Sequence, residues 1–451
     1  MSRIPRSFLL AGTLSVFSIA VYLLVSALMY RIGFPLDDAW IHQTYARSLG
    51  LKGEWSFIPG QPSAGSTAPL WSGLLAIGHA LRLGPYLWTY SLGWALLATL
   101  SLLGALAFKV YLPQKAGWAP LAAVLIIFEW HLVWASASGM ETLLFAFLVI
   151  LLITWLAAGW GRWVELGLLI GLSAWVRPDG ITLLAPAVLV LTLLAPGRRE
   201  WIRSSLPLIL GFLAFFAPYL LFNRLLAGAW WPNTFYAKQA EYAALLGIPL
   251  ARRYLDQVSP LLQGVGVVLL PGFFMFVWSA CRRRAWGALA GAAWVVGDLG
   301  LYAWRLPVAY QHGRYLIPVL PIYLIMGAAG SAEWLQTGSP ILWRRVVSRA
   351  WIISAAAVLL IYWITGAAAY GGDVAFIESE MVPAAQWVAE NTQAESLVAA
   401  HDIGALGYFA GRPLLDLAGL VSPEVIPFIR DEAQLQKFLD EKDAEYLVAF
   451  P

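Results

Sequence analysis

Charged residues and cysteine are scarce in this chain. Only 12% of its 451 residues are charged and 60% are hydrophobic, whereas a soluble protein carries about twice that charged fraction. The single cysteine, Cys281, excludes an intrachain disulfide and a metal site built from several cysteines. The composition therefore excludes a soluble protein and is typical of a polytopic membrane protein, in which 24 Trp and 18 Tyr suit the membrane–water interface.

Acidic and basic side chains are distributed unevenly between two parts of the chain. Residues 1–370 hold 12 acidic and 25 basic side chains, whereas residues 371–451 hold 14 and 4. We therefore expect a transmembrane module over 1–370 and a small soluble α/β domain over 371–451, with no nucleic-acid partner. In the tail, VPAAQWVAENT predicts a helix, ESLVAA and RPLLDLAG predict short strands, and EAQLQKFLDEKDAEYLVAF predicts a helix followed by a strand.

Apolar runs long enough to cross a bilayer recur along residues 1–370, since a spanning helix needs about 20 apolar residues. We expect about eleven transmembrane helices. They are residues 8–30, 86–108, 118–135, 141–159, 163–177, 180–195, 204–226, 260–280, 285–303, 315–331 and 350–370. The first run follows Arg3 and Arg6 and lacks a cleavage site, so we expect a retained span with a cytoplasmic N-terminus.

The basic residues between these spans set the expected orientation. With eleven spans, all the basic loops lie on the side of Arg3 and Arg6, as the positive-inside rule requires. Counting residues 68–84 as a twelfth span would move them outward, so we expect an interfacial helix there. The chain is then a multi-pass plasma-membrane protein, N-terminus in and C-terminus out. Its outer loops are residues 31–85, 227–259 and 304–314, and its site and C-terminal domain are extracytoplasmic.

Polar residues gather in the segments that are expected to face outward. In FPLDDAWIHQTYARSLG, Asp37 and Asp38 directly follow the first span. A lipid-facing acid costs about 2.5–3.5 kcal/mol at the bilayer centre, so the pair is expected in water or in a site. Five segments send polar groups to the same face, which predicts one convergent cleft. They carry Asp37, Asp38, His42 and Arg47; Glu141; Arg177 and Asp179; Asn233, Tyr236 and Lys238; and His312, Arg314 and Tyr315.

An ordered series of motifs over most of the chain resembles the GT-C glycosyltransferase superfamily, membrane enzymes that use polyprenyl-phosphate sugars as donors. The motifs are LDDAWIHQTYARSL, GQPSAGSTAPLWSGLLA, GMETLLF, RPDG, PNTFYAK, GRYLIPVLP and DIGALGYFAGRPLLDLAGL. The series is most similar to the bacterial branch near the mycobacterial terminal arabinofuranosyltransferases. The resemblance implies inverting transfer of a sugar to a hydroxyl of a glycan, lipid or protein acceptor at the outer membrane face.

The resemblance also implies roles for the residues in these motifs. Asp37 is expected to act as general base on the acceptor hydroxyl, and Asp38 to orient the acceptor or hold a metal. Arg314 is the first candidate to bind the leaving phosphate, followed by Arg177 and Lys238. The remaining substrate-binding candidates are Glu141, His42, His312 and Tyr315. Asp38 with Glu141 could hold a divalent cation (Mg²⁺, Mn²⁺ or Ca²⁺).

Simpler interpretations stay open for most of these residues. Asp37 and Asp38 could only cap the helix that follows, and Glu141 could only favour its helix dipole. Arg177 could form a local ion pair with Asp179. Asp298, inside a predicted span, is expected to face the bundle and pair internally.

Alternative functions also stay open. A transporter or flippase predicts internal repeats and midplane charges, and we find no repeat. An O-antigen ligase or polymerase-like protein of lipid-linked glycans would rely on Arg and His in a late outer loop, as in QHGRY.

Overall fold

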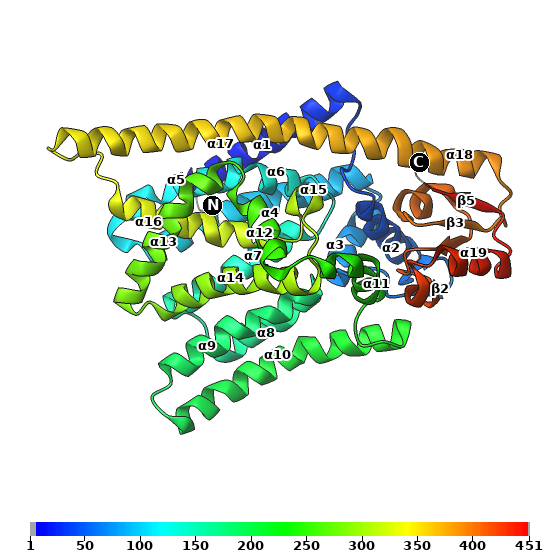
Figure 1. Ribbon diagram of the computed structural model, residues 1–451, viewed down its shortest axis with the longest axis horizontal. Helices are drawn as coiled ribbons and strands as arrows, with labels where there is room; N and C mark the ends of the chain where they lie inside the picture. Colours follow the sequence, from blue (N-terminus) through cyan, green and yellow to red (C-terminus); the bar gives the residue numbers. More distant parts are fainter. Residues whose placement is uncertain (1–5, 450–451) are drawn as a thin grey trace.

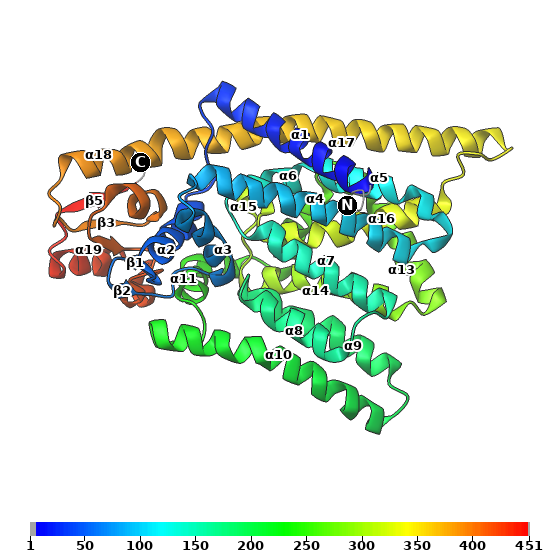
Figure 2. The same cartoon turned by 180° about the vertical axis from the view of Figure 1, so that it is seen from behind.

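The computed structural model describes residues 6–449, so Arg3 lies outside the described residues. Long helices run side by side along the long axis of the molecule, and a small region with strands lies at one end (Figure 1). Seen from behind, α10 (Arg198–Ala227) follows one edge of the bundle and α17 (Leu342–Phe376) follows the opposite edge (Figure 2). The chain is an elongated helical bundle with an α/β region at one end.

Hydropathy and length identify six helical stretches within residues 6–449 that could cross a membrane, or seven if one bent pair is a single span. The six are α1 (Arg6–Met29), α4 (Pro85–Tyr111), α10, α13 (Val265–Arg283), Tyr310–Trp334 with α16 (Leu320–Trp334), and Leu342–Asn391 with α17. The pair comprises η1 (Pro113–Trp118) with α5 (Ala119–Phe128), and α6 (Trp130–Ser136), bent by 58°. The Glu129 carboxylate accepts the Leu132 amide at 3.0 Å and so caps α6 at the bend. The expectation of a polytopic helical membrane protein is confirmed.

The expected number of eleven spans is not confirmed, although each expected segment contains helix. The other four are α7 (Thr142–Ala158), α8 (Trp163–Ala174), η2 (Pro178–Leu183) with α9 (Leu184–Leu194), and α14 (Trp286–Arg305). Three of these are apolar helices of 10–17 residues, shorter than the roughly 20 residues that a spanning helix needs. In α7, Ala146, Val149 and Ile153 are fully buried, so other helices surround much of its length and it need not match the bilayer thickness by itself.

The first long loop folds into α2 (Asp38–Lys52), the hairpin of β1 (Ser56–Ile58) with β2 (Gln61–Pro62), and α3 (Pro69–Ala80). The stretch expected to be interfacial is thus the 12-residue α3, which is too short to span. It buries Trp71 and leaves Ile77 and Leu81 exposed. A Cβ at Gly50 would lie 2.5 Å from the Ala76 carbonyl oxygen, so only glycine lets α2 and α3 approach this closely.

The other two expected loops form short helices, of which the first lies beside α2 (Figure 1). They are α11 (Asn233–Glu241), η3 (Tyr242–Gly247), α12 (Leu250–Leu262), α15 (Tyr310–Gly313) and η4 (Ile317–Val319). In α15, Gln311 and His312 have φ values of 51° and 60°, a left-handed backbone that costs non-glycine residues energy. This tight turn precedes Arg314.

The C-terminal region confirms the expected small α/β fold. Three parallel strands pair in the order β4-β3-β5, and their sheet packs with Val425 and Phe438 in a small core. The elements are η5 (Ile377–Met381), α18 (Val382–Asn391), β3 (Val398–Ala400), η6 (Leu406–Ala410), β4 (Leu414–Asp416), η7 (Pro423–Phe428), α19 (Glu432–Glu441) and β5 (Tyr446–Val448). Leu342–Asn391 forms one helical stretch, so the backbone has no break at the expected boundary of 370/371.

Candidate active site

Two cavities of about 320 Å³ each lie where the helical bundle meets the C-terminal region. The bundle cavity is lined mainly by α11, α14, the start of α7 and the Arg177–Thr182 segment. The interface cavity lies between the helices and residues 401–403, 418 and 420 of the C-terminal region. Asp38, Lys238 and Arg314 line both cavities, so one charged cluster forms their common wall.

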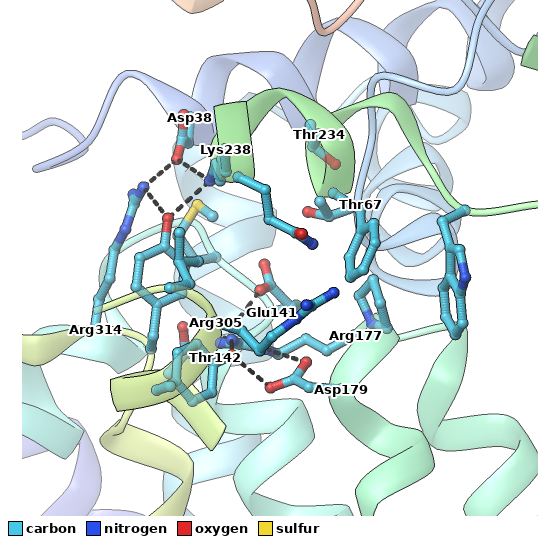
Figure 3. Close-up of a pocket in the computed structure, with 18 of the residues that line it drawn as sticks. Asp38, Thr67, Glu141, Thr142, Arg177, Asp179, Thr234, Lys238, Arg305 and Arg314 are labelled. Carbon is cyan, nitrogen blue, oxygen red and sulfur yellow. Dashed lines mark hydrogen bonds and ion pairs between the residues drawn. The ribbon is translucent and has the colours of Figure 1, made fainter. Parts of the chain in front are cut away.

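This wall is a compact ion-pair cluster (Figure 3). The Arg314 guanidinium lies 2.7 Å from the Asp38 carboxylate, and the Lys238 ammonium lies 3.9 Å from it. Both cations donate to the Tyr315 hydroxyl, at 3.0 and 2.8 Å. Burial would raise the pKa of Asp38, but the charges of Arg314 and Lys238 outweigh burial and hold that pKa below its usual value.

Arg314 retains capacity to bind a further group. The residue is only 8% exposed, and its Nε has no hydrogen-bond partner among the described residues. A buried, unpaired N–H is costly and rare in native structures. The wall therefore offers a guanidinium N–H beside an ammonium at the junction of the two cavities.

Lys238 is held at this junction by the packing of α11. The Asn233 backbone amide donates to the Ala64 carbonyl at 3.1 Å, and its side-chain amide donates to the Leu420 carbonyl at 3.0 Å. These bonds tie the first turn of α11 to the first loop and to the C-terminal region. Burial would lower the pKa of Lys238, but the Tyr315 hydroxyl and Asp38 keep that pKa above its usual value.

A second charged group lines the bundle cavity around Glu141 (Figure 3). The Glu141 carboxylate lies 3.9 Å from Arg177 and 3.5 Å from the His42 Nε2, and its Oε2 accepts no hydrogen bond from the described residues. Arg177 donates to Asp179 at 3.1 Å and to the Tyr302 hydroxyl at 2.6 Å. The local Arg177–Asp179 pair is therefore present, but Arg177 also faces the cavity.

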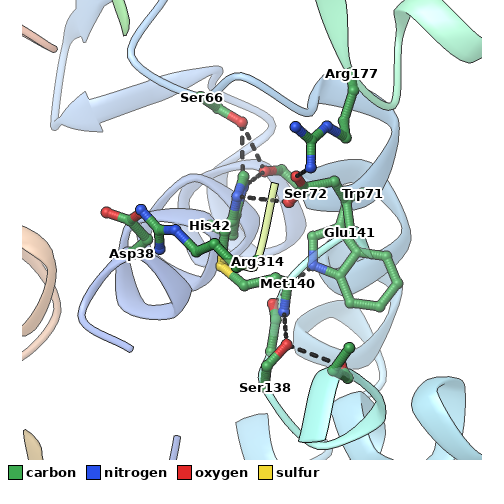
Figure 4. A network of polar contacts seen from close by, with 12 residues as sticks. Asp38, His42, Ser66, Trp71, Ser72, Ser138, Met140, Glu141, Arg177 and Arg314 are labelled. Atoms are coloured by element: carbon green, nitrogen blue, oxygen red, sulfur yellow. Dashed lines mark hydrogen bonds and ion pairs between the residues drawn. The ribbon is translucent and has the colours of Figure 1, made fainter. Parts of the chain in front are cut away.

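His42 is buried in a small polar network (Figure 4). Its Nδ1 lies 3.0 Å from the Ser72 hydroxyl and 3.3 Å from that of Ser66, while Nε2 faces Glu141. These contacts join α2, the loop before α3, α3 itself and the start of α7. They fix the imidazole beside the cavity.

Asp37 lies in the interface cavity and contacts the C-terminal region rather than its own helix. Its two carboxylate oxygens accept the backbone amides of Gly404 and Ala405, both at 2.7 Å, and it makes no side-chain cap to α2. Burial, with the charges of Asp402 and Asp38 in addition, raises the pKa of Asp37 to about 7, although the two amides lower it. A buried carboxyl group with a pKa near neutrality is suited to proton transfer.

The structure thus brings most of the sequence-predicted residues together. Asp38, His42, Glu141, Arg177, Lys238, Arg314 and Tyr315 line the bundle cavity, and Asp37 lines the interface cavity. His312 lines neither cavity: its Nε2 lies 2.8 Å from Asp373, and its ring packs edge-on against Trp130 and Trp134. A role for His312 in substrate binding stays a prediction.

The predicted divalent-cation site does not fit the donors that are present. Asp38 is engaged by Arg314 and Lys238, and Glu141 faces Arg177. Within residues 6–449, no group of three or more His, Cys, Asp or Glu side chains is arranged to hold a metal ion. Two carboxylates already faced by cations are poor ligands for Mg²⁺ or Ca²⁺, which prefer several oxygen donors.

Sequence reasoning missed several residues that line these cavities. Arg305, at the end of α14, lines the bundle cavity, and no ion pair engages it among the described residues. The only feature of the sequence that could have pointed to Arg305 was its position at the end of a predicted span. Glu241 and Asp373 line the interface cavity, but nothing in their local sequence points to a site.

Asp298 is buried as expected, yet it is not paired. It is 5% exposed in α14, and its Oδ1 has no hydrogen-bond partner among residues 6–449. The expectation that Asp298 pairs internally is therefore not met.

Comparisons with known proteins support a fold and no closer relationship. A family described as a domain of unknown function (DUF8728) matches residues 373–451, and no curated protein matches the chain. The crystal structure of ArnT from Cupriavidus metallidurans bound to undecaprenyl phosphate is 16% identical, with 92% of this chain and 88% of that chain covered and a TM-score of 0.54. The apo crystal structure of the Archaeoglobus fulgidus oligosaccharyltransferase is 11% identical, with 91% and 64% covered and a TM-score of 0.64.

At such low identity, the similarity shows a shared fold. A cryo-EM structure of the mycobacterial arabinofuranosyltransferase AftD has a TM-score of 0.46 and is 18% identical, with 36% of that chain covered, too low a similarity to support the arabinofuranosyltransferase branch predicted from the motifs. The chain is a polytopic membrane protein whose fold is similar to those of ArnT and of the Archaeoglobus fulgidus oligosaccharyltransferase.

Proposed function

We propose that this protein transfers a sugar from a polyprenyl-phosphate donor to a hydroxyl acceptor, with inversion, at the outer face of the plasma membrane. The observation that carries the proposal is the Asp38–Lys238–Arg314 wall between a cavity with cations and apolar side chains and a cavity with carboxylates. The GT-C fold supports the reaction class by analogy.

The bundle cavity suits the donor. Trp231, Phe235, Leu301 and Leu306 give it apolar walls, while Arg177, Lys238, Arg305 and Arg314 supply positive charge. When the bond between the anomeric carbon and the phosphate oxygen breaks, negative charge grows on the phosphate. Cations already held in place stabilise that charge without reorganisation, and a planar guanidinium matches phosphate geometry.

Asp37 is the proposed general base. The amides of Gly404 and Ala405 orient its carboxylate, and a pKa of about 7 allows it to accept a proton near neutral pH. It takes the proton of the acceptor hydroxyl while the oxygen attacks the anomeric carbon and the phosphate leaves. A single displacement from the opposite face inverts the anomeric centre, as in inverting glycosidases, with the acceptor oxygen in place of water.

Asp38 positions the cations in this scheme. It holds Arg314 and Lys238 side by side when the donor is absent. A donor phosphate would take over part of that pairing, because its oxygens accept hydrogen bonds from the same guanidinium and ammonium groups.

Sugar transfer in membranes that hold the wild type, Asp37→Asn or Asp38→Asn tests the proposal, with a panel of labelled polyprenyl-phosphate sugars as donors. Asp37→Asn keeps the size of the side chain and removes the base, so we expect a loss of about 10²–10⁴-fold. Asp256→Asn is the control, because Asp256 lies on the exposed face of α12 in a local pair with Arg252.

Each other outcome has a definite meaning. A fully active Asp37→Asn variant would show that Asp37 is not the base, and Asp38 would become the next candidate. A wild type that consumes none of the donors overturns the proposal and favours the flippase or the ligase and polymerase alternatives.

A further inference from the structure

Carboxylates outnumber Lys and Arg side chains in the interface cavity, whereas Lys and Arg outnumber carboxylates in the bundle cavity. Four carboxylates line it that do not line the bundle cavity, and its only Lys and Arg are those of the shared wall, which pair with Asp38. The four are Asp37, Glu241, Asp373 and Asp402. Three of them keep exposed side chains: Glu241 is 26%, Asp373 34% and Asp402 40% exposed. The cavity is therefore acidic and open to water.

Two observations besides the carboxylates indicate that a ligand binds here. The cavity has a volume of about 320 Å³, enough for one or two sugar rings on the scale of small-molecule pockets. Arg314 lines it with an unpaired Nε although the residue is more than nine-tenths buried. Trp134, Tyr242 and Tyr310 add aromatic faces, and carboxylates are strong acceptors for the hydroxyl hydrogens of a polyol.

The C-terminal region supplies one wall of this cavity. Asp402 and His401 come from the loop after β3, and His401 lies 3.6 Å from Glu241 of α11. Figure 1 shows the strands and α19 beside α2 and α11 at that end of the bundle.

We propose, on the basis of the proposed function, that the interface cavity is the acceptor site and that it selects a hydroxyl-rich glycan terminus without negative charge. A neutral or amine-bearing sugar can donate hydrogen bonds to the exposed carboxylates of Glu241, Asp373 and Asp402. A uronate or a phosphorylated sugar would place a like charge among them, and like-charge contacts at an interface cost several kcal/mol. Residues 373–451, which match a domain of unknown function, would then recognise the acceptor.

The test uses the full chain in nanodiscs and three octyl hexosides that differ only in charge: a neutral hexoside, its amino derivative and its uronide. Saturation-transfer NMR measures binding of each hexoside, and a labelled polyprenyl-phosphate sugar gives transfer and donor binding separately. We expect the neutral and amino hexosides to bind at least about tenfold more tightly than the uronide, which corresponds to about 1.4 kcal/mol.

The double variant Glu241→Gln, Asp402→Asn should reduce that discrimination about tenfold and leave donor binding unchanged, because neither residue lines the bundle cavity. The control is Asp440→Asn, Glu441→Gln, which removes the same charge from the exposed face of α19. A uronide bound as tightly as the neutral hexoside, no binding by any hexoside, or equal effects of the two double variants would overturn the proposal. Charge-selective binding without donor consumption would overturn the proposed function and the acceptor role, and would leave only a charge-selective glycan site in this cavity.

Discussion

A single methyl group at Gly404 should test how strongly the C-terminal region controls the reaction. A Cβ at this position would lie 2.1 Å from the Asp37 backbone oxygen and 2.6 Å from its Oδ2. Carbon and oxygen atoms in ordinary contact are about 3.4–4 Å apart, so Asp37 and residue 404 must separate by about an ångström. The φ of Gly404 is not in the left-handed region, so the lack of space alone is responsible.

Gly404→Ala should therefore displace the carboxylate that we propose as base while leaving its chemistry intact. A misplacement of about 1 Å costs on the order of 10²-fold in rate, or about 2.7 kcal/mol in the barrier. The KM for the donor should change little, because Gly404 does not line the bundle cavity. Crowding of this kind also destabilises a fold by about 1–3 kcal/mol, so thermal unfolding is measured in parallel.

The assay is initial-rate sugar transfer with purified protein, scored as kcat and KM for the donor. Gly338→Ala serves as the control, because a Cβ there meets no atom within 4 Å. A Gly404→Ala variant with wild-type kcat would refute the view that these amides position Asp37. A variant with an altered donor KM and an unchanged kcat would refute the division of roles between the two cavities.

Four further outcomes are expected. The transfer rate should rise with pH through about 7 and then level off, because the raised pKa of Asp37 leaves its carboxyl protonated at lower pH; a pH–rate profile from about 5 to about 9 checks this. Arg314→Ala should raise the donor KM about 10–100-fold, since hydrogen bonds to charged groups contribute about 1.5–3 kcal/mol. Glu378→Ala should lower the free energy of unfolding by about 1–3 kcal/mol, because the fully buried Glu378 accepts from Arg31 and from the Tyr86 hydroxyl at 2.9 Å; thermal unfolding in detergent measures it. Chelation of divalent cations should leave the rate unchanged, because the predicted metal ligands face Arg and Lys side chains; a rate lost to a chelator and restored by Mg²⁺ would contradict this.

Local sequence predicted where the helices and strands lie and which of the helices are apolar. Hydropathy predicted every apolar helix, and the tail pattern predicted α18, β3, β4, α19 and β5 in order. It was a poorer guide to how many helices cross the membrane, because a short helix such as α7 is buried among its neighbours rather than in lipid.

The residues of the candidate site also differ in whether sequence alone could identify them. Segments that carry Asp38, Arg177 and Arg314 could be identified from sequence because charge beside an apolar run is conspicuous. Glu241 could not, and Asp402, in the DIGALG motif, could be placed at a strand end but not at a cavity wall, since local sequence does not show which segments face each other. Their importance depends on His401 lying 3.6 Å from Glu241, a contact between residues 160 positions apart.

The sequence by itself determined that this is a membrane protein with an acidic α/β tail, because hydropathy and charge are summed over local residues and need no knowledge of contacts. Only the tertiary structure decided that the tail closes a cavity over Asp37 and that Asp38, Lys238 and Arg314 separate two cavities. Pairing and burial of charges depend on which distant segments pack together, and that packing sets both the pKa of Asp37 and the different balance of charge in the two cavities.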